Sequence, residues 1–326
     1  MGILDPGFLT YLGVIAGIYA LLALGLYIQF SMAGLPNFGH VAFMAVAAYT
    51  MAILIIRYAV PWPIAVGAGF IPAAAFALLV GIPSLRLRSD YLAIVTVAGS
   101  EIVRYVAMNA EDVTGGPVGS IAMAGPSSIA VYDSGPLALI DSIRAPLEPY
   151  LGNLASRDFV MFIFVWILAI FFLALARRLE ASPWGRVLKS IREDEDAAAS
   201  VGKDVYSYKL QALLIGSLLG ALAGMLLAVE IGVFSPIDYQ PTLTFYAYLI
   251  LILGGLNRVW AIPLGAVAFG LIYSGTRFLD FYPLSLVNSG DRAFLRLLFV
   301  GVLLVAFMAI RPQGLLGNRR ELLLEK

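Results

Sequence analysis

The chain has 326 residues, of which 61% are hydrophobic and 13% are charged, and its mean hydropathy is +0.90. A soluble fold of this size would expose large apolar patches, so the composition excludes a soluble globular protein and favours a membrane protein. Lys plus Arg and Asp plus Glu balance at 21 each, which argues against a nucleic-acid partner, and the lack of cysteine excludes disulfides and thiolate metal sites.

Apolar runs long enough to span a bilayer, about 20 residues each, recur along the chain and predict transmembrane helices. The first run lacks a basic leader and a small-residue cleavage site, so we expect a retained span. Because the runs are continuously apolar, they exclude a barrel. The sequence predicts an all-α integral membrane protein, a polytopic helical bundle of about nine (eight to ten) transmembrane helices. The predicted spans are 8–28, 37–56, 62–82, 91–108, 159–176, 209–229, 242–256, 261–279 and 293–310.

The distribution of basic residues predicts the orientation in the membrane. They cluster after the third, fifth and seventh spans and at the end of the chain, whereas the alternate loops are poorer in basic residues or acidic. We therefore expect an outside N-terminus and a cytoplasmic C-terminus, with Arg57 as the one departure on the outer side. The clusters comprise Arg86, Arg88, Arg177, Arg178, Arg186, Lys189, Arg192, Arg258, Arg311, Arg319, Arg320 and Lys326.

The stretch Gly34–Phe43 mixes glycine, proline and asparagine at the start of an otherwise apolar span. Pro36 and the flanking glycines favour a broken helix, whose new start would expose backbone N–H groups. Transporters place such half-helix ends near anionic substrate groups. Asn37, Gly39 and His40 are therefore candidates for a substrate pathway. For His40, a hydrogen bond to the backbone of a neighbouring helix is an equal alternative.

The fourth predicted span contains polar and charged residues. Glu101 and Arg104 lie three residues apart and share a helix face. Charge within a bilayer is costly and normally faces protein or water. The two side chains either pair with each other, which we favour, or line the solute route. Thr96 and Ser100 are uncharged polar candidates for that route on the same helix.

Two loops are longer than simple connectors. The first, 109–158, is rich in glycine and proline, which forbid a long regular helix and suit an external loop. It is either a surface for an external partner or a tolerated excursion. The second, 180–208, falls on the predicted cytoplasmic side. Its acidic residues 193–196 precede three alanines and favour a short helix, which Gly202 is placed to end in the left-handed conformation. This segment is either an amphipathic docking helix or a solvated loop.

Gly216, Gly220 and Gly224 repeat every four residues in the sixth span and remove side-chain bulk from one helix face. We predict that this face serves helix packing, within the chain by default or against a second membrane subunit. The sequence contains one histidine and no phosphate-binding loop, so we expect neither enzymatic activity nor a metal site nor a cofactor.

Several ordered motifs resemble those of the membrane permeases of branched-chain (hydrophobic) amino acid ABC transporters, of the larger inner-membrane type. Asp196-Ala-Ala followed by Gly202 is similar to the pattern Glu-Ala-Ala-x-x-x-Gly by which importer permeases contact their ATPases, with aspartate in place of glutamate. The other matching segments are Gly34–Phe43, Leu87–Thr96, Glu101–Arg104, Thr114–Pro117, Ile191–Glu195 and Arg311–Leu315.

The resemblance implies one transmembrane permease domain over residues 1–326 in a prokaryotic inner membrane. It implies an importer of branched-chain, hydrophobic or neutral amino acids, with a homologous second permease, two cytoplasmic ATP-binding subunits that hydrolyse ATP and an extracytoplasmic substrate-binding protein. A urea or short-amide ABC permease and a stand-alone ion-coupled secondary transporter are the alternatives. The ATPase-docking residues that it implies are Arg192, Glu195, Asp196, Ala197, Ala198 and Gly202.

Overall fold

The computed structural model describes residues 6–86, 89–124, 136–151 and 156–275, together with scattered positions between 298 and 316. Every regular element in these ranges is a helix, which confirms the predicted all-α class. Six helices are long and apolar enough to cross a bilayer, and they match the first six predicted spans. They are α1 (Pro6–Leu26) with its π-helical continuation η1 (Tyr27–Met32), α2 (Val41–Tyr58), α3 (Trp62–Ser84), α4 (Ser89–Asn109), α8 (Arg157–Ala181) and α11 (Val205–Ile231).

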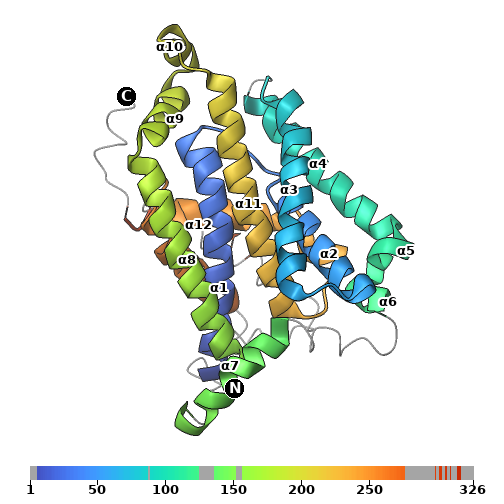
Figure 1. The fold of residues 1–326 in the computed structure, drawn as a ribbon. Coiled ribbons are helices and arrows are strands. Elements are labelled where there is room, and N and C mark those ends of the chain that lie inside the picture. The colour runs from blue at the N-terminus through green and yellow to red at the C-terminus, as the bar shows by residue number, and fades with distance from the viewer. Residues whose placement is uncertain are drawn as a thin grey trace.

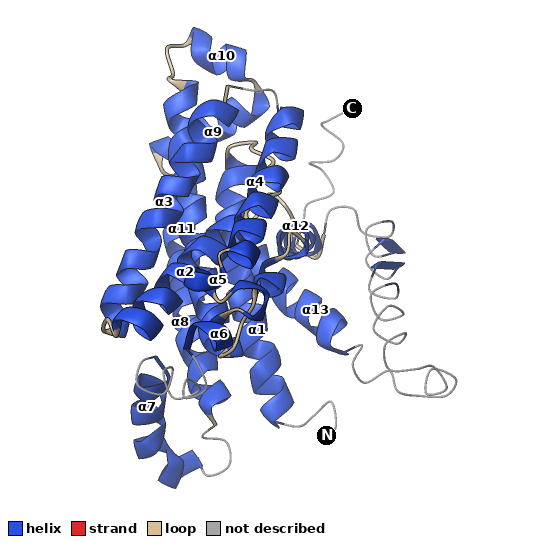
Figure 2. Cartoon of the chain, turned by 90° about the vertical axis from the view of Figure 1, so that its right-hand side faces the viewer, coloured by secondary structure: helices blue, strands red, loops and turns tan. Residues whose placement is uncertain are grey.

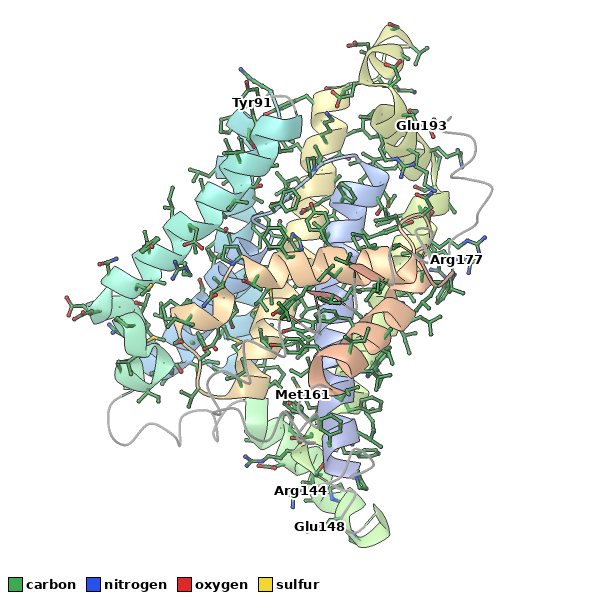
Figure 3. The ribbon with its side chains drawn as sticks, turned by 180° about the vertical axis from the view of Figure 1, so that it is seen from behind. Tyr91, Arg144, Glu148, Met161, Arg177 and Glu193 are labelled. Atoms are coloured by element: carbon green, nitrogen blue, oxygen red, sulfur yellow. The ribbon has the colours of Figure 1, made fainter. Side chains whose placement is uncertain are left out.

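Where the sequence predicted a seventh membrane span, at 242–256, the structure has the shorter helix α12 (Thr242–Gly254). Its 13 residues rise about 20 Å, less than the roughly 30 Å of the hydrocarbon core. Figures 1 and 3 show α12 lying across the long helices rather than alongside them. Its sequence is apolar because it is buried in protein. The next helix, α13, is described over Ala261–Gly275, and the ninth predicted span, 293–310, lies almost entirely outside the described residues.

Three of the shorter helices mark the two ends of the bundle (Figures 1 and 2). One end, here called the α10 end, carries α9 (Pro183–Glu193) and α10 (Glu195–Ser200). The opposite end, here called the α7 end, carries α7 (Pro136–Leu151) and the start of α1. The remaining short elements are α5 (Glu111–Thr114), η2 (Gly116–Val118), α6 (Ser120–Ala124) and η5 (Pro236–Tyr239).

The segment 109–158 differs from its prediction because it contains α7, a helix of 16 residues. Proline lacks an N–H group, which costs nothing at the first helical position, and Pro136 begins the helix there. Pro146 and Pro149 lie inside its second half and did not prevent it. Glycine and proline content alone therefore overstated the irregularity of this segment.

The long helices end where local signals stop them. After α2, Ala59 adopts the left-handed conformation with φ of 49° and Pro61 follows two residues later, directly before α3. The Ser156 hydroxyl caps α8 by accepting from Phe159 N–H over 3.1 Å. Gly232, with φ of 74°, ends α11. These caps fix where each span meets the ends of the bundle.

The centre of the bundle consists of α1 and α11. The most apolar 18-residue window is 94% buried in the α1 span and 78% buried in α11, compared with 33% in α8, 28% in α3 and 22% in α4. In Figure 1, α1 and α11 stand side by side between α8 and α3, and α11 also packs against α2. The helices α3, α4 and α8 therefore present much of their surface outward.

Close packing in the centre depends on the glycines of α11. A Cβ atom at Gly224 would lie 2.3 Å from Met44 Cα in α2. At Gly216 it would lie 2.6 Å from a backbone oxygen of α1, and at Gly220 it would lie 2.9 Å from the imidazole of His40. The glycine face of α11 is therefore covered by α1 and α2 of the same chain.

Candidate functional site

A buried cluster of amides holds the break between η1 and α2. Asn37 Nδ2 donates to Gln29 Oε1 over 2.9 Å, and Gly39 N–H donates to Asn37 Oδ1 over 2.9 Å. Gln29 Nε2 donates in turn to Leu213 O of α11 over 3.0 Å. The Gln29 and Asn37 side chains are 0% and 1% exposed, so their polar atoms need protein partners. The cluster ties the break to both central helices.

We predicted that the start of α2 would expose backbone N–H groups, and the described structure contradicts this. Phe38 N–H donates to Thr96 Oγ1 of α4 over 3.1 Å, and Val41 N–H donates to Thr244 Oγ1 of α12 over 3.0 Å. A buried N–H without an acceptor is costly, and these threonines supply the acceptors. A Cβ atom at Gly39 would lie 1.9 Å from Thr96 O, so glycine allows α4 to approach.

His40 lies fully buried where α1, α2 and α11 meet. Cβ atoms added at Gly25 of α1 and Gly220 of α11 would each lie 2.9 Å from its Nε2. The ring of Phe43 packs edge-on against the imidazole, with centroids 5.6 Å apart. Two glycines on neighbouring helices therefore create the space that this ring occupies.

Glu101 and Arg104 form an ion pair on α4. Arg104 Nη2 and Nε donate to Glu101 Oε2 over 2.5 Å and 3.0 Å. The guanidinium also lies 4.7 Å from the centre of the Tyr105 ring. Ser100, one residue before the pair, faces the interior and donates to Val97 O of its own helix over 2.7 Å. The pairing that we favoured is present.

The predicted pathway residues therefore fall into two groups. Asn37, Gly39, His40 and Thr96 come together at the helix break, whereas Ser100, Glu101 and Arg104 continue along α4 away from it. Sequence reasoning missed two residues of the first group. Gln29 carried a signal, because it is a lone amide in an apolar span, but Thr244 carried none, because its partner lies 203 residues away.

The predicted docking segment folds as α10 after a break at Asp194. The Asp194 carboxylate caps the helix by accepting from Ala197 N–H over 2.9 Å. Glu195 and Asp196 lie in its first turn, where the helix dipole favours anions. Gly202 follows with φ of 78°, the left-handed conformation that the sequence predicted. All of α10 except Ala198 is exposed.

Polar contacts connect the docking segment to the membrane helices. Arg192, at the end of α9, is exposed and donates through Nη1 to Ser31 O of η1 over 2.6 Å, so it contacts the element that precedes the helix break. Lys189 of α9 pairs with Glu180 of α8 over 2.7 Å. Lys209 of α11 pairs with Glu195 of α10. These contacts would therefore transmit a displacement of α9 and α10 to η1, α8 and α11.

Asp204 is the N-cap residue of α11 and follows the docking segment directly. Its carboxylate accepts from the Ser207 hydroxyl over 2.5 Å and from Ser207 N–H over 3.2 Å. The hydrogen bond from the Ser207 hydroxyl, reinforced by the N–H, holds the pKa of the Asp204 carboxyl below its ordinary value. This cap fixes the point at which the segment rejoins the bundle.

A second group of charges occupies the α7 end. Figure 3 shows Arg144 and Glu148 of α7 there, at the far end of the molecule from Glu193. Arg157, at the start of α8, donates to both carboxylate oxygens of Asp141 over 2.5 Å and 2.9 Å. These hydrogen bonds lower the pKa of the Asp141 carboxyl. The α7 end therefore carries an exposed ionic surface.

Two cavities beside α8 are lined almost wholly by carbon. One, of about 100 Å³, lies where α7, α8 and α11 meet, beside Met161 and Leu222. The other, of about 330 Å³, lies between α8 and α11 beside Phe172. An amino acid needs polar partners for its ammonium and carboxylate, so neither cavity suits one. Among the described residues, no group of three His, Asp or Glu side chains is arranged to hold a metal ion.

Comparisons with known proteins identify the family. The family described as the branched-chain amino acid transport system / permease component matches residues 8–308. The high-affinity branched-chain amino acid transport system permease proteins LivM of Salmonella typhimurium and Escherichia coli are 33% and 32% identical to the chain, and each match covers 93% of this chain and 68% of the relative.

A probable branched-chain amino acid transport permease protein LivM of Methanocaldococcus jannaschii is 25% identical, with 93% of this chain and 91% of that protein covered. No solved structure gives a significant match. Apart from the first two residues of α1, the family match spans every described helix from α1 to α13. The chain therefore belongs to the branched-chain amino acid transport permease family.

Proposed function

We propose that the chain is the permease subunit of an ATP-driven importer of branched-chain or other hydrophobic amino acids. The family match over residues 8–308 carries this proposal, and the LivM relatives, named for branched-chain amino acid transport, support it. The chain is a multi-pass membrane protein that supplies the path across the bilayer. ATP is hydrolysed by separate subunits, and the membrane is the prokaryotic inner membrane.

The α10 end is the cytoplasmic end and receives the ATPase. The exposed acidic first turn of α10 and its N-terminal cap at Asp194 support this assignment. Closure of the ATPases would press on α10 and α9, and the contacts of Arg192, Lys189 and Lys209 would carry that movement to η1, α8 and α11. Arg192, which is exposed and also bonded to η1, serves both as an ATPase contact and as a link into the bundle.

The α7 end is extracytoplasmic and receives the substrate-binding protein. Its exposed charges offer polar contacts to a soluble partner. This orientation puts the N-terminus outside and, by the distribution of basic residues, the C-terminus inside. A second, homologous permease completes the membrane part of the transporter.

The solute passes beside the helix break when the bundle opens. In the described conformation the polar atoms of Asn37, Gly39 and Thr96 bond to one another, to the Gln29 side chain or to neighbouring backbone. Contact with an amino acid would require α4 to separate from the start of α2, which would free the Phe38 N–H group for a carboxylate. The described conformation is thus a closed state of this route.

The experiment is recovery of an ATPase with the chain from native membranes under mild conditions. Ala199→Arg adds bulk to the exposed face of α10 without removing a hydrogen bond, and Glu148→Arg is the control at the α7 end. We expect an ATPase with the native chain and the control but not with Ala199→Arg. A chain that purifies without an ATPase, yet transports leucine when reconstituted alone, would be a gradient-driven carrier instead.

A further inference from the structure

α4 carries an ion pair at the middle of a membrane span that is poorly covered by its own chain. The span runs over Tyr91–Asn109, so Glu101 lies about 2 Å and Arg104 about 6 Å from its midpoint along the helix axis. The Arg104 and Glu101 side chains are 16% and 31% exposed. Even on permissive scales, a charged side chain at this depth costs about 3 kcal/mol in lipid. The surroundings of this pair are therefore not simply lipid.

The ion pair supplies hydrogen-bond donors to only one of the two Glu101 carboxylate oxygens. Both bonds from Arg104 end on the same oxygen, Oε2 of Glu101. Among the described residues, none donates a hydrogen bond to the other oxygen, Oε1. In hydrocarbon an acceptor without a donor is costly, whereas a neighbouring protein helix can supply the donor.

The helix geometry separates a buried face from an outward face. Leu92, Thr96, Ser100 and Ala107 are buried and recur at helical spacing, so they define the inner face of α4. We call the opposite side the outer face of α4; it is formed by Ile94, Glu101, Ile102 and Tyr105, and its three uncharged members are 66%, 62% and 55% exposed. The outer face is thus a mixed surface, apolar and aromatic around a charged centre.

The exposed side of α8 shows the contrast. Ile167, Ile170 and Phe171 are 61%, 56% and 60% exposed, and no charged residue occurs between Asp158 and Arg177. Such a surface needs nothing but lipid. The glycine face of α11 is already covered within the chain, so it has no surface left for another subunit.

We propose that the outer face of α4 is the contact surface for the second permease-type subunit of the transporter, with the Glu101–Arg104 pair enclosed in the contact. This inference rests on the proposed function. The partner is a transmembrane helix that presents a hydrogen-bond donor to Glu101 near the centre of the membrane. The same contact removes the exposed apolar side chains on either side of the pair from lipid.

The test is photo-crosslinking of the assembled transporter in native membranes. A benzophenone amino acid replaces Ile102 on the outer face of α4 or, as the control, Ile167 on α8. The two positions are 62% and 61% exposed, and both lie near the middle of their helices. We expect irradiation to give, from position 102, an adduct with a second membrane subunit, several-fold more abundant than any from position 167.

Adducts with lipid alone from both positions, or protein adducts mainly from position 167, would overturn the proposal. Recovery of the ATPase is scored on the same samples. An ATPase that is recovered without a position-102 adduct would refute the interface and leave the proposed function intact. An ATPase absent from unmodified membranes would overturn the proposed function, and the inference with it.

Discussion

The same substitution, glycine to alanine, should have opposite effects at two membrane positions of this protein. At Gly224 the added Cβ would lie 2.3 Å from Met44 Cα and 2.4 Å from Met44 O, whereas an ordinary contact is 3.4–4 Å. The helices α11 and α2 would have to separate by about 1 Å, because a backbone cannot rotate away as a side chain can. At Gly67 on α3, nothing lies within 4 Å of the added atom.

The expected magnitudes follow from two competing effects. Alanine is favoured over glycine in a helix by about 1 kcal/mol, which should stabilise Gly67→Ala by up to that amount. Overpacking of a tight contact costs about 1–3 kcal/mol, and in Gly224→Ala it also disturbs the hydrogen bond from Tyr239 Oη to Gly224 O. We therefore expect a net loss of about 2 kcal/mol in Gly224→Ala.

The assay is a titration of the purified protein with sodium dodecyl sulfate in mixed micelles, followed by tryptophan fluorescence. The dodecyl sulfate fraction at the midpoint of unfolding should fall for Gly224→Ala and stay the same or rise for Gly67→Ala. If both variants lost stability equally, the loss would reflect alanine in any span, and the argument from the close approach of α11 and α2 would fail. An unchanged midpoint in Gly224→Ala would show that these helices lie further apart.

Two further substitutions test the helix break and its link to the docking segment. Thr244→Val removes the acceptor of the buried Val41 N–H and should cost about 1–3 kcal/mol in the same titration. Thr50→Val, whose hydroxyl bonds only within its own helix, should cost much less, and equal losses would contradict the capping role. Arg192→Ala removes the hydrogen bond to Ser31 O. The assembled transporter should still hydrolyse ATP but import less amino acid per ATP hydrolysed. Arg192→Lys should give an import ratio between those of the native protein and Arg192→Ala. A parallel fall of hydrolysis and uptake, measured in proteoliposomes, would argue against the link.

Hydropathy was sufficient to predict the long helices, because length and apolar composition determine whether a helix can cross a bilayer. It failed for α12, because residues buried in protein are as apolar as residues buried in lipid, so composition does not reveal the direction of a helix. Local chemistry predicted α10 and its end at Gly202, since a capping carboxylate, alanines and glycine act on the nearest few residues.

The candidate site was predictable only in part. Pro36 and its neighbours indicated a break, and the spacing of Glu101 and Arg104 indicated a pair, because both features depend on adjacent residues. The acceptors that close the break come from Thr96 and Thr244, on helices far away in the sequence. No local pattern identifies such partners, and only the packed bundle brings them together.

The burial of α1 has a consequence for how the protein is made. This span is the first of the described helices to leave the ribosome, yet its neighbours α8 and α11 follow later, α11 roughly 170 residues after Met32. At a synthesis rate of about 5–20 residues per second, about 9 to 35 s pass between the synthesis of α1 and that of the start of α11. Because the surface of α1 is continuously apolar, lipid can solvate the helix until neighbouring helices pack against it. The most deeply enclosed helix of the finished bundle is thus, during biogenesis, the one longest exposed.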